Sequence, residues 1–368
     1  MRIPEIDIAR GFTVFIMAAI HALMIYSTPD VHVSWLGKIM FFLAEGPGAP
    51  LFMMMMGISF VLSGRTNTIS NLKRAGLHFV LAYVLNFFKF LIPLAAGIIP
   101  AQLLSDFGIA SGDKTVMHLF LLGDILQLAA ISMLVLSLLI KIRNYQYWAM
   151  LLAIMIALSA PYLWEIHSSN TLVDHFCNLL WGYNSKVYFP VFPWLVYPLV
   201  GVSAGYFLKL QLRITQPVFF IKARNVGIAL VLTGLIIISF DPAFHWGDFY
   251  RTGQGGTIYY TGFVLLWLYG CHLAVKYLPQ NYFFRLLTFL SKHITRVYLV
   301  QWILIFWLIG VIGYRSLDVM ESVICITIVS GMVFSIAALP ESISKLVGRM
   351  TIRNQKYKNA INAAQGEN

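Results

Sequence analysis

The stretch IMFFLAEGPGAPLFMMMMGISFVLSGR, residues 39–65, decides the fold class, because it is long and apolar and ends in an arginine. A helix needs about 20 mostly apolar residues to cross roughly 30 Å of hydrocarbon. Nine further stretches share this character. The ten are Ile8–Ser27, Ile39–Ser63, Ala75–Ile98, Val116–Ile140, Tyr147–Trp164, Val187–Leu208, Asn225–Phe240, Thr257–Leu278, His293–Gly313 and Val319–Leu339. The sequence therefore predicts an all-α, polytopic membrane protein with about ten transmembrane helices.

The composition agrees with this class. Hydrophobic residues make up 59% of the chain and charged residues only 11%, whereas soluble proteins carry about 25% charged residues. The three cysteines, Cys177, Cys271 and Cys325, are scattered without CxxC spacing, so neither a disulfide framework nor a metal site is predicted. We expect one integral domain over residues 1–340 and a basic cytoplasmic tail over residues 341–368 that lies on anionic lipid.

The positive charges predict the orientation. With the amino terminus inside, 20 of the 26 Lys and Arg fall in cytoplasmic segments. The outer segments hold Lys38, Lys114, Lys186, Arg251 and Arg315. Basic residues concentrate in cytoplasmic loops, so both termini are predicted to be cytoplasmic. Because this pattern explains the net charge of +11, nucleic acid is not an expected partner.

Two of the apolar stretches contain helix-breaking residues. Glu45-Gly-Pro-Gly-Ala-Pro50 interrupts the second stretch, and irregular backbone at membrane depth persists only against protein or a water-filled cavity. The break therefore indicates a site, with a kinked packing helix as the alternative. In the sixth stretch, Gly201 and Gly205 have the small-x-x-x-small spacing of closely packed helices. Trp194 is either an interfacial anchor or a pocket residue.

Four ionisable residues lie at similar predicted depths in the outer half of the membrane. Lys89 is 9 residues from the outer end of its stretch and Asp124 is 8, or roughly 12–13 Å at 1.5 Å per residue. They are expected to pair, for structural or functional reasons. His21 and Glu45 lie roughly 9 Å deep by the same reckoning. A buried histidine beside a carboxylate makes a general base or nucleophile.

Several further polar residues are candidates for binding. Gln127 shares a helix face with Asp124, and with Asn86 it could donate to a thioester oxygen. Gln301 is expected either to form an interhelical hydrogen bond or to belong to the site.

Motifs in the first 210 residues resemble those of transmembrane acyltransferases. Asp7-Ile-Ala-Arg10-Gly11 followed by His21 resembles the Arg-x10-His opening of acyltransferase-3 proteins. His32-Val-Ser-Trp-Leu-Gly37 is similar to the His-Ala-Ser-Trp-Asn-Gly loop of the heparan-α-glucosaminide N-acetyltransferase family. Later segments of that family and its bacterial relatives resemble Ala49–Phe52, Gly57–Ser59, Gly123–Gln127, and Pro193-Trp194 with the glycines Gly201 and Gly205.

The resemblance implies an enzyme that passes an acetyl group from cytosolic acetyl-CoA to an amino sugar across the membrane. It places the reactive histidine at His32, whereas acyltransferase-3 proteins place it at His21. The heparan enzyme typically has Asn at the His21 position, a different approach to the second span, and Arg where Leu128 follows Gln127. The choice between the two histidines, and the acceptor, therefore remain open.

We therefore expect a multi-pass acetyltransferase in the cytoplasmic membrane of a prokaryote. Its expected partners are acetyl-CoA, a sugar or glycan acceptor with an amino or hydroxyl group, the bilayer, and a second copy in a homodimer. The predicted catalytic residues are His32, His21, Asp124 and Glu45. Predicted donor-binding residues are Arg10, Asn86, Lys89, Gln127, Trp194 and Gln301. The alternatives are a solute transporter or flippase that uses the same polar site, and a structural membrane component with a partner-recruiting tail.

Overall fold

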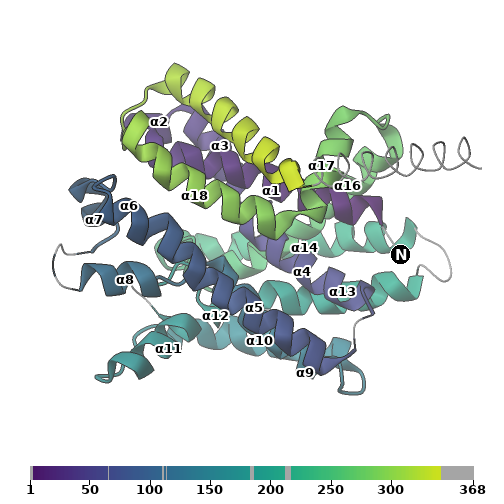
Figure 1. Cartoon of the computed structure of the whole chain (residues 1–368). Coiled ribbons are helices and arrows are strands. Elements are labelled where there is room, and N and C mark those ends of the chain that lie inside the picture. The colour runs from purple at the N-terminus through teal and green to yellow at the C-terminus, as the bar shows by residue number, and fades with distance from the viewer. Residues whose placement is uncertain are drawn as a thin grey trace, which may run out of the picture.

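The chain forms a bundle of long helices (Figure 1). The computed structural model describes residues 3–64, 66–109, 112, 114–182, 186–211 and 217–340. Within these ranges, β-structure is limited to two isolated bridges, Ser27 with Leu317 and Gly123 with Val187. Arg65 and the tail predicted at residues 341–368 lie outside the described residues.

The bundle consists of long helices joined by short ones. The long helices are α1 (Pro4–Tyr26), α5 (Thr68–Asn86), α10 (Tyr145–Leu163), α13 (Val196–Gln211), α14 (Pro217–Phe240), α16 (Gln254–Tyr277), α18 (Ile294–Ile312) and the helix Val319–Pro340. Those of intermediate length are α3 (Trp35–Glu45), α4 (Ala49–Leu62), α9 (Ile125–Leu139), α11 (Thr171–Trp181) and α17 (Tyr282–Lys292). The shortest are α2 (Pro29–Val33), η1 (Phe87–Leu91), α6 (Ile92–Ala95), α7 (Ala101–Asp106), α8 (Thr115–Leu121), α12 (Val191–Trp194) and α15 (Pro242–Trp246).

The prediction of an all-α, polytopic membrane protein is confirmed. Nine helical segments in the described part of the chain are long and apolar enough to cross a bilayer. They coincide with nine of the ten predicted stretches. The short helices α2, α7 and α8 and the intermediate helix α11 gather at one end of the bundle, on the left of Figure 1. The loop charges predict that this end faces outward.

The predicted break in the second span lies between α3 and α4. The α3 helix ends at Glu45, and α4 begins at Ala49. A side chain on Gly48 would collide with the backbone carbonyl of Ala44, so the turn requires glycine. The break therefore leaves Glu45 at a helix end inside the bundle.

The fourth predicted span differs from the expectation, because it is also broken. Val116–Ile140 was expected to be one helix, yet it divides into α8 and α9 around Gly123. The Gly123 N–H donates to the Lys186 carbonyl at 2.9 Å, and the Tyr188 N–H donates to the Gly123 carbonyl at 3.0 Å. This bridge to the segment before α12 replaces helical hydrogen bonds and places Asp124 at the start of α9.

Glycines let α4 and α13 pack backbone to backbone. A Cβ atom at Gly57 would collide with the Pro198 carbonyl, and one at Gly201 would collide with the Met54 carbonyl. Gly205 also faces the backbone of Ile58. The close approach predicted from the spacing of the glycines is therefore confirmed, and it fixes the position of α4 directly after the break that follows Glu45.

Candidate active site

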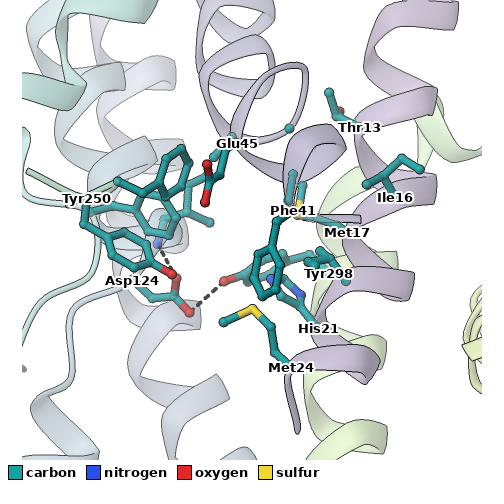
Figure 2. A pocket seen from close by; sticks show the side chains of 17 residues that line it. Thr13, Ile16, Met17, His21, Met24, Phe41, Glu45, Asp124, Tyr250 and Tyr298 are labelled. Atoms are coloured by element: carbon teal, nitrogen blue, oxygen red, sulfur yellow. Dashed lines mark hydrogen bonds between the residues drawn. The ribbon is translucent and has the colours of Figure 1, made fainter. Parts of the chain in front are cut away.

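Three of the predicted catalytic side chains line one cavity of about 180 Å³. His21 comes from α1, Glu45 from the end of α3 and Asp124 from the start of α9. Figure 2 shows the two carboxylates on one side of the cavity and His21 across from them. The remaining wall is mostly apolar and includes Thr13, Met17, Phe41, Phe189, Phe249, Tyr250 and Tyr298. Two broken helices and one continuous helix thus bring these groups together.

Asp124 is the most heavily bonded member of the site. Its Oδ1 accepts from the Ile125 N–H at 2.7 Å. Its Oδ2 accepts from Lys89 Nζ at 3.2 Å and from the Tyr298 hydroxyl at 2.8 Å. The predicted pairing of Lys89 with Asp124 is therefore present, with the lysine side chain only 2% exposed. A carboxylate with these partners is held in one orientation.

Lys89 and His21 both contact the indole ring of Trp302. Lys89 Nζ lies 4.6 Å from the ring centroid of Trp302 and 4.5 Å from that of Phe90. The His21 imidazole stacks on Trp302 with the ring centroids 4.0 Å apart. Cation–π contact with two rings stabilises a buried ammonium. Trp302 therefore connects the ion pair to the histidine without a direct hydrogen bond.

Gln301 fixes the orientation of the His21 ring. Its Nε2 lies 3.2 Å from His21 Nδ1, and the Gln301 side chain is fully buried. This is the interhelical hydrogen bond expected for Gln301, and it lies directly behind a cavity residue. The second ring nitrogen of His21, Nε2, is left for chemistry in the cavity.

Asn86 and Gln127 support the break in the fourth span. Asn86 Nδ2 donates to the carbonyls of Phe120 at 2.9 Å and Leu122 at 2.8 Å. Gln127 Nε2 donates to Leu122 O at 3.2 Å, and its Oε1 accepts from Asp124 N at 3.0 Å. These bonds satisfy backbone groups that the missing helical turn leaves open. The thioester contact proposed for these amides stays a prediction, since neither residue lines the cavity.

An aromatic cluster forms the wall opposite α1. Trp194 is 1% exposed, and its Nε1 donates to the Tyr250 carbonyl at 2.8 Å. It also packs edge-on against Phe189 and Phe249, which line the cavity. Trp194 therefore supports the wall from behind. Burial, and to a smaller extent the nearby Asp124 carboxylate, raises the pKa of Tyr250, so its phenol stays a proton donor.

His32 lies beside the cavity and does not line it. It sits on α2, with Nε2 3.3 Å from the Leu23 carbonyl, and its ring contacts the edge of Phe41 at 5.6 Å between centroids. Phe41 lines the cavity. Burial lowers the pKa of His32, partly offset by this hydrogen bond, so the ring is neutral near pH 7. Its predicted catalytic role stays a prediction.

Two further cavities reach from the predicted cytoplasmic side toward the site. One of about 410 Å³ is lined by Arg10, Arg74, Asn71 and His78. A second of about 390 Å³ contains Asp7 and Lys292, and both include Arg10. The larger one shares Ile125 and Tyr298 with the His21 cavity. Among the described residues, only these two side chains line both the larger inner cavity and the His21 cavity, so they form the partition between those two.

The sequence missed several residues of the site. Tyr298, Trp302 and Tyr250 belong to no motif singled out in the sequence, and aromatic residues make up 15% of this chain. Their spacing along the sequence does not indicate that they line or support a cavity formed by helices that are distant in the sequence. No cluster of three or more His, Cys, Asp or Glu side chains suitable for a metal occurs in the part of the chain that the structure describes.

A comparison with protein families matches residues 2–251 to the family described as heparan-alpha-glucosaminide N-acetyltransferase, catalytic. The chain belongs to this family. The match extends over the helices that carry His21, His32, Glu45 and Asp124. Membership in the heparan-alpha-glucosaminide N-acetyltransferase family makes the chain a membrane-bound acetyltransferase at the level of its general activity. A comparison with curated proteins finds no match.

Proposed function

We propose that this protein transfers an acetyl group from cytosolic acetyl-CoA to the amino or hydroxyl group of a sugar at the outer face, in the cytoplasmic membrane of a prokaryote. The observation that carries the proposal is the arrangement of the cavities. A small chamber with an imidazole and two carboxylates is separated by Ile125 and Tyr298 from basic cavities on the predicted inner side. An enzyme that joins a donor and an acceptor from opposite sides needs this arrangement.

The donor is proposed to enter from the inner side. Arg10, Arg74 and Lys292 line the two inner cavities, and cationic side chains suit the phosphates of coenzyme A. Arg10 and His21 are 11 residues apart on α1, or roughly 17 Å at 1.5 Å per residue. That span is comparable to an extended pantetheine arm. The thioester then reaches the chamber when Tyr298 and Ile125 move apart.

His21 is proposed to act as the general base. A half-turn of the Gln301 side-chain amide exchanges the positions of its Oε1 and Nε2 atoms. Gln301 Oε1 is buried and has no hydrogen-bond partner among the described residues. With the Gln301 Oε1 turned toward His21, it accepts a hydrogen bond from His21 Nδ1–H. The lone pair of His21 Nε2 is then free. Nε2 then takes a proton from the acceptor nitrogen or oxygen as this atom bonds to the acetyl carbon.

The carboxylates and the phenol complete the mechanism. Glu45, which lines the chamber, is proposed to bind the acceptor amine or hydroxyl, while Asp124 stays paired with Lys89 and holds Tyr298. The C–S bond breaks, and the coenzyme A thiolate takes the proton from the imidazolium. Tyr250 can donate to the carbonyl oxygen as negative charge develops there. His32 is the alternative base, or a nucleophile that carries the acetyl group, and it would need Phe41 to move.

A transfer assay with purified protein tests the proposal. With radiolabelled acetyl-CoA and glucosamine as probes, we expect His21→Ala to lower transfer by about 100-fold or more, the usual contribution of a general base. His32→Ala is measured in parallel to compare the two histidines. His167→Ala is the matched control, because the His167 side chain is half exposed and does not line the chamber. Full activity of both His21→Ala and His32→Ala would remove imidazole chemistry from the mechanism. Solute uptake into vesicles without consumption of acetyl-CoA would favour a transporter.

A further inference from the structure

A further cavity, separate from the three described above, lies on the lipid-facing side of the bundle. Its volume is about 480 Å³, and α10, α13, α14 and α16 line it. Buried residues such as Val196 and Leu265 form its floor. Ile154 on α10 and Val226 on α14 are each 50% exposed at its rim. The cavity is therefore a cleft that opens sideways toward the bilayer.

The wall of the cleft is apolar despite three hydroxyl groups. Ser203 donates to the Gln146 carbonyl at 2.7 Å, Thr257 to the Gly253 carbonyl at 3.2 Å and Thr261 to the Thr257 carbonyl at 2.8 Å. Each hydroxyl is satisfied by backbone within the protein. The cleft therefore offers hydrocarbon contact along most of its length and suits an acyl chain.

The inner end of the cleft is polar. Gln211 and Lys222 line it there, at the last residue of α13 and the first turns of α14. Gln211 Oε1 is buried without a hydrogen-bond partner among the described residues, whereas Lys222 is exposed. From Val196 to Gln211 the cleft follows all 16 residues of α13, a rise of roughly 22 Å, which is longer than one leaflet of a ~30 Å hydrocarbon core.

We propose that this cleft binds one anionic glycerophospholipid of the inner leaflet. One acyl chain lies along α13, the phosphate faces Lys222, and a headgroup hydroxyl donates to Gln211 Oε1. The Lys222 ammonium suits the phosphodiester, and the Gln211 Oε1 acceptor suits a hydroxyl donor on the headgroup. Phosphatidylglycerol has both groups. Basic side chains at the inner surface attract anionic lipid. The lipid fills the space among α10, α13, α14 and α16, and α13 in turn packs against α4.

Native mass spectrometry of delipidated protein tests this site. Dioleoylphosphatidylglycerol is titrated into the full chain in detergent, with dioleoylphosphatidylcholine as the comparison. We expect each chain to retain one phosphatidylglycerol molecule tightly and to retain phosphatidylcholine more weakly. Lys222→Ala should weaken phosphatidylglycerol binding by about fivefold, the effect of one basic residue near the surface. Lys209→Ala is the matched control, since Lys209 is exposed near the same end of α13 and does not line the cleft.

A filling variant tests the acyl chain independently. Val226→Trp adds bulk at an exposed rim position, so folding should persist while lipid retention falls. Transfer activity need not change, which separates this proposal from the proposed function. Equal retention of the two lipids, or wild-type binding by Lys222→Ala, would overturn the proposal. So would lipid-free dimers that Val226→Trp dissociates, because a second copy would then occupy the cleft.

Discussion

Removing the Lys89 ammonium should destabilise the protein more than any change at an exposed ion pair. The Lys89 side chain is 2% exposed and that of Asp124 is 10% exposed. Loss of one partner of a buried pair costs about 3–5 kcal/mol, because the other charge stays buried. In Lys89→Met, Asp124 keeps its bonds to Ile125 N and the Tyr298 hydroxyl. We therefore expect the lower end, about 3 kcal/mol.

The double variant Lys89→Met/Asp124→Asn separates stability from chemistry. The asparagine Oδ1 can accept from Ile125 N, its Nδ2 can donate to the Tyr298 oxygen, and no buried charge is left, so most of the lost stability should return. The coupling between the two changes should be about 2 kcal/mol. Acetyl transfer should stay low in the double variant, since a neutral amide cannot replace the Asp124 carboxylate.

Thermal unfolding in detergent measures these effects. A loss of about 3 kcal/mol corresponds to a fall in Tm of roughly 4 °C, at an unfolding entropy of about 2.1 cal/mol/K per residue. Lys186→Met is the matched control, because the Lys186 side chain is 48% exposed in its pair with Asp174 and such pairs contribute about 1 kcal/mol or less. If Lys89→Met and Lys186→Met lower Tm equally, or if the double variant is simply additive, the reasoning about burial is wrong.

Four further changes test the remaining parts of the site. Tyr298→Phe removes a hydrogen bond to a carboxylate, so it should cost about 1.5–3 kcal/mol and lower the transfer rate; unchanged stability would contradict the bond. Ile125→Trp should narrow the partition and slow acetyl transfer more than it weakens retention of acetyl-CoA, as measured by comparing turnover with binding. Gln301→Leu should lower kcat and alter the pH profile with little change in the KM for acetyl-CoA; an unaltered profile would exclude a role in orienting His21. For His32, burial lowers the folded-state pKa, so the folded protein binds fewer protons than the unfolded chain and loses stability as pH falls below about 6.5. Between pH 7.5 and pH 5, the Tm of His32→Gln should fall less than that of the unaltered protein. An equal fall in Tm would refute the argument.

The sequence predicted what depends on hydropathy and position along a helix. Span locations follow from apolar length, and the Lys89–Asp124 pair follows from matching depth. The break beside Glu45 follows from two prolines and two glycines in six residues. These features are local, or depend only on how far each residue lies from the membrane surface.

What the sequence could not predict depends on contacts between distant segments. The second break at Gly123 has no proline, and it results from pairing with Val187, more than 60 residues away. Similarly, nothing local distinguishes Tyr298 from other tyrosines in apolar helices. Its place in the partition arises because α18 packs on η1 and α5, so that the Tyr298 hydroxyl reaches Asp124 at the start of α9. The separation of His21 from His32 by Phe41 is likewise a consequence of how α2 folds back on α3.

The partition formed by Ile125 and Tyr298 has a consequence for the cell. Where the inner and outer chambers meet, the permeability barrier is carried by two side chains instead of by lipid. A passage wide enough for a thioester would also admit water and protons if it stayed open. In the proposed orientation, Tyr298, held by Asp124, closes this passage between turnovers, and we expect a variant with a small residue there to leak protons.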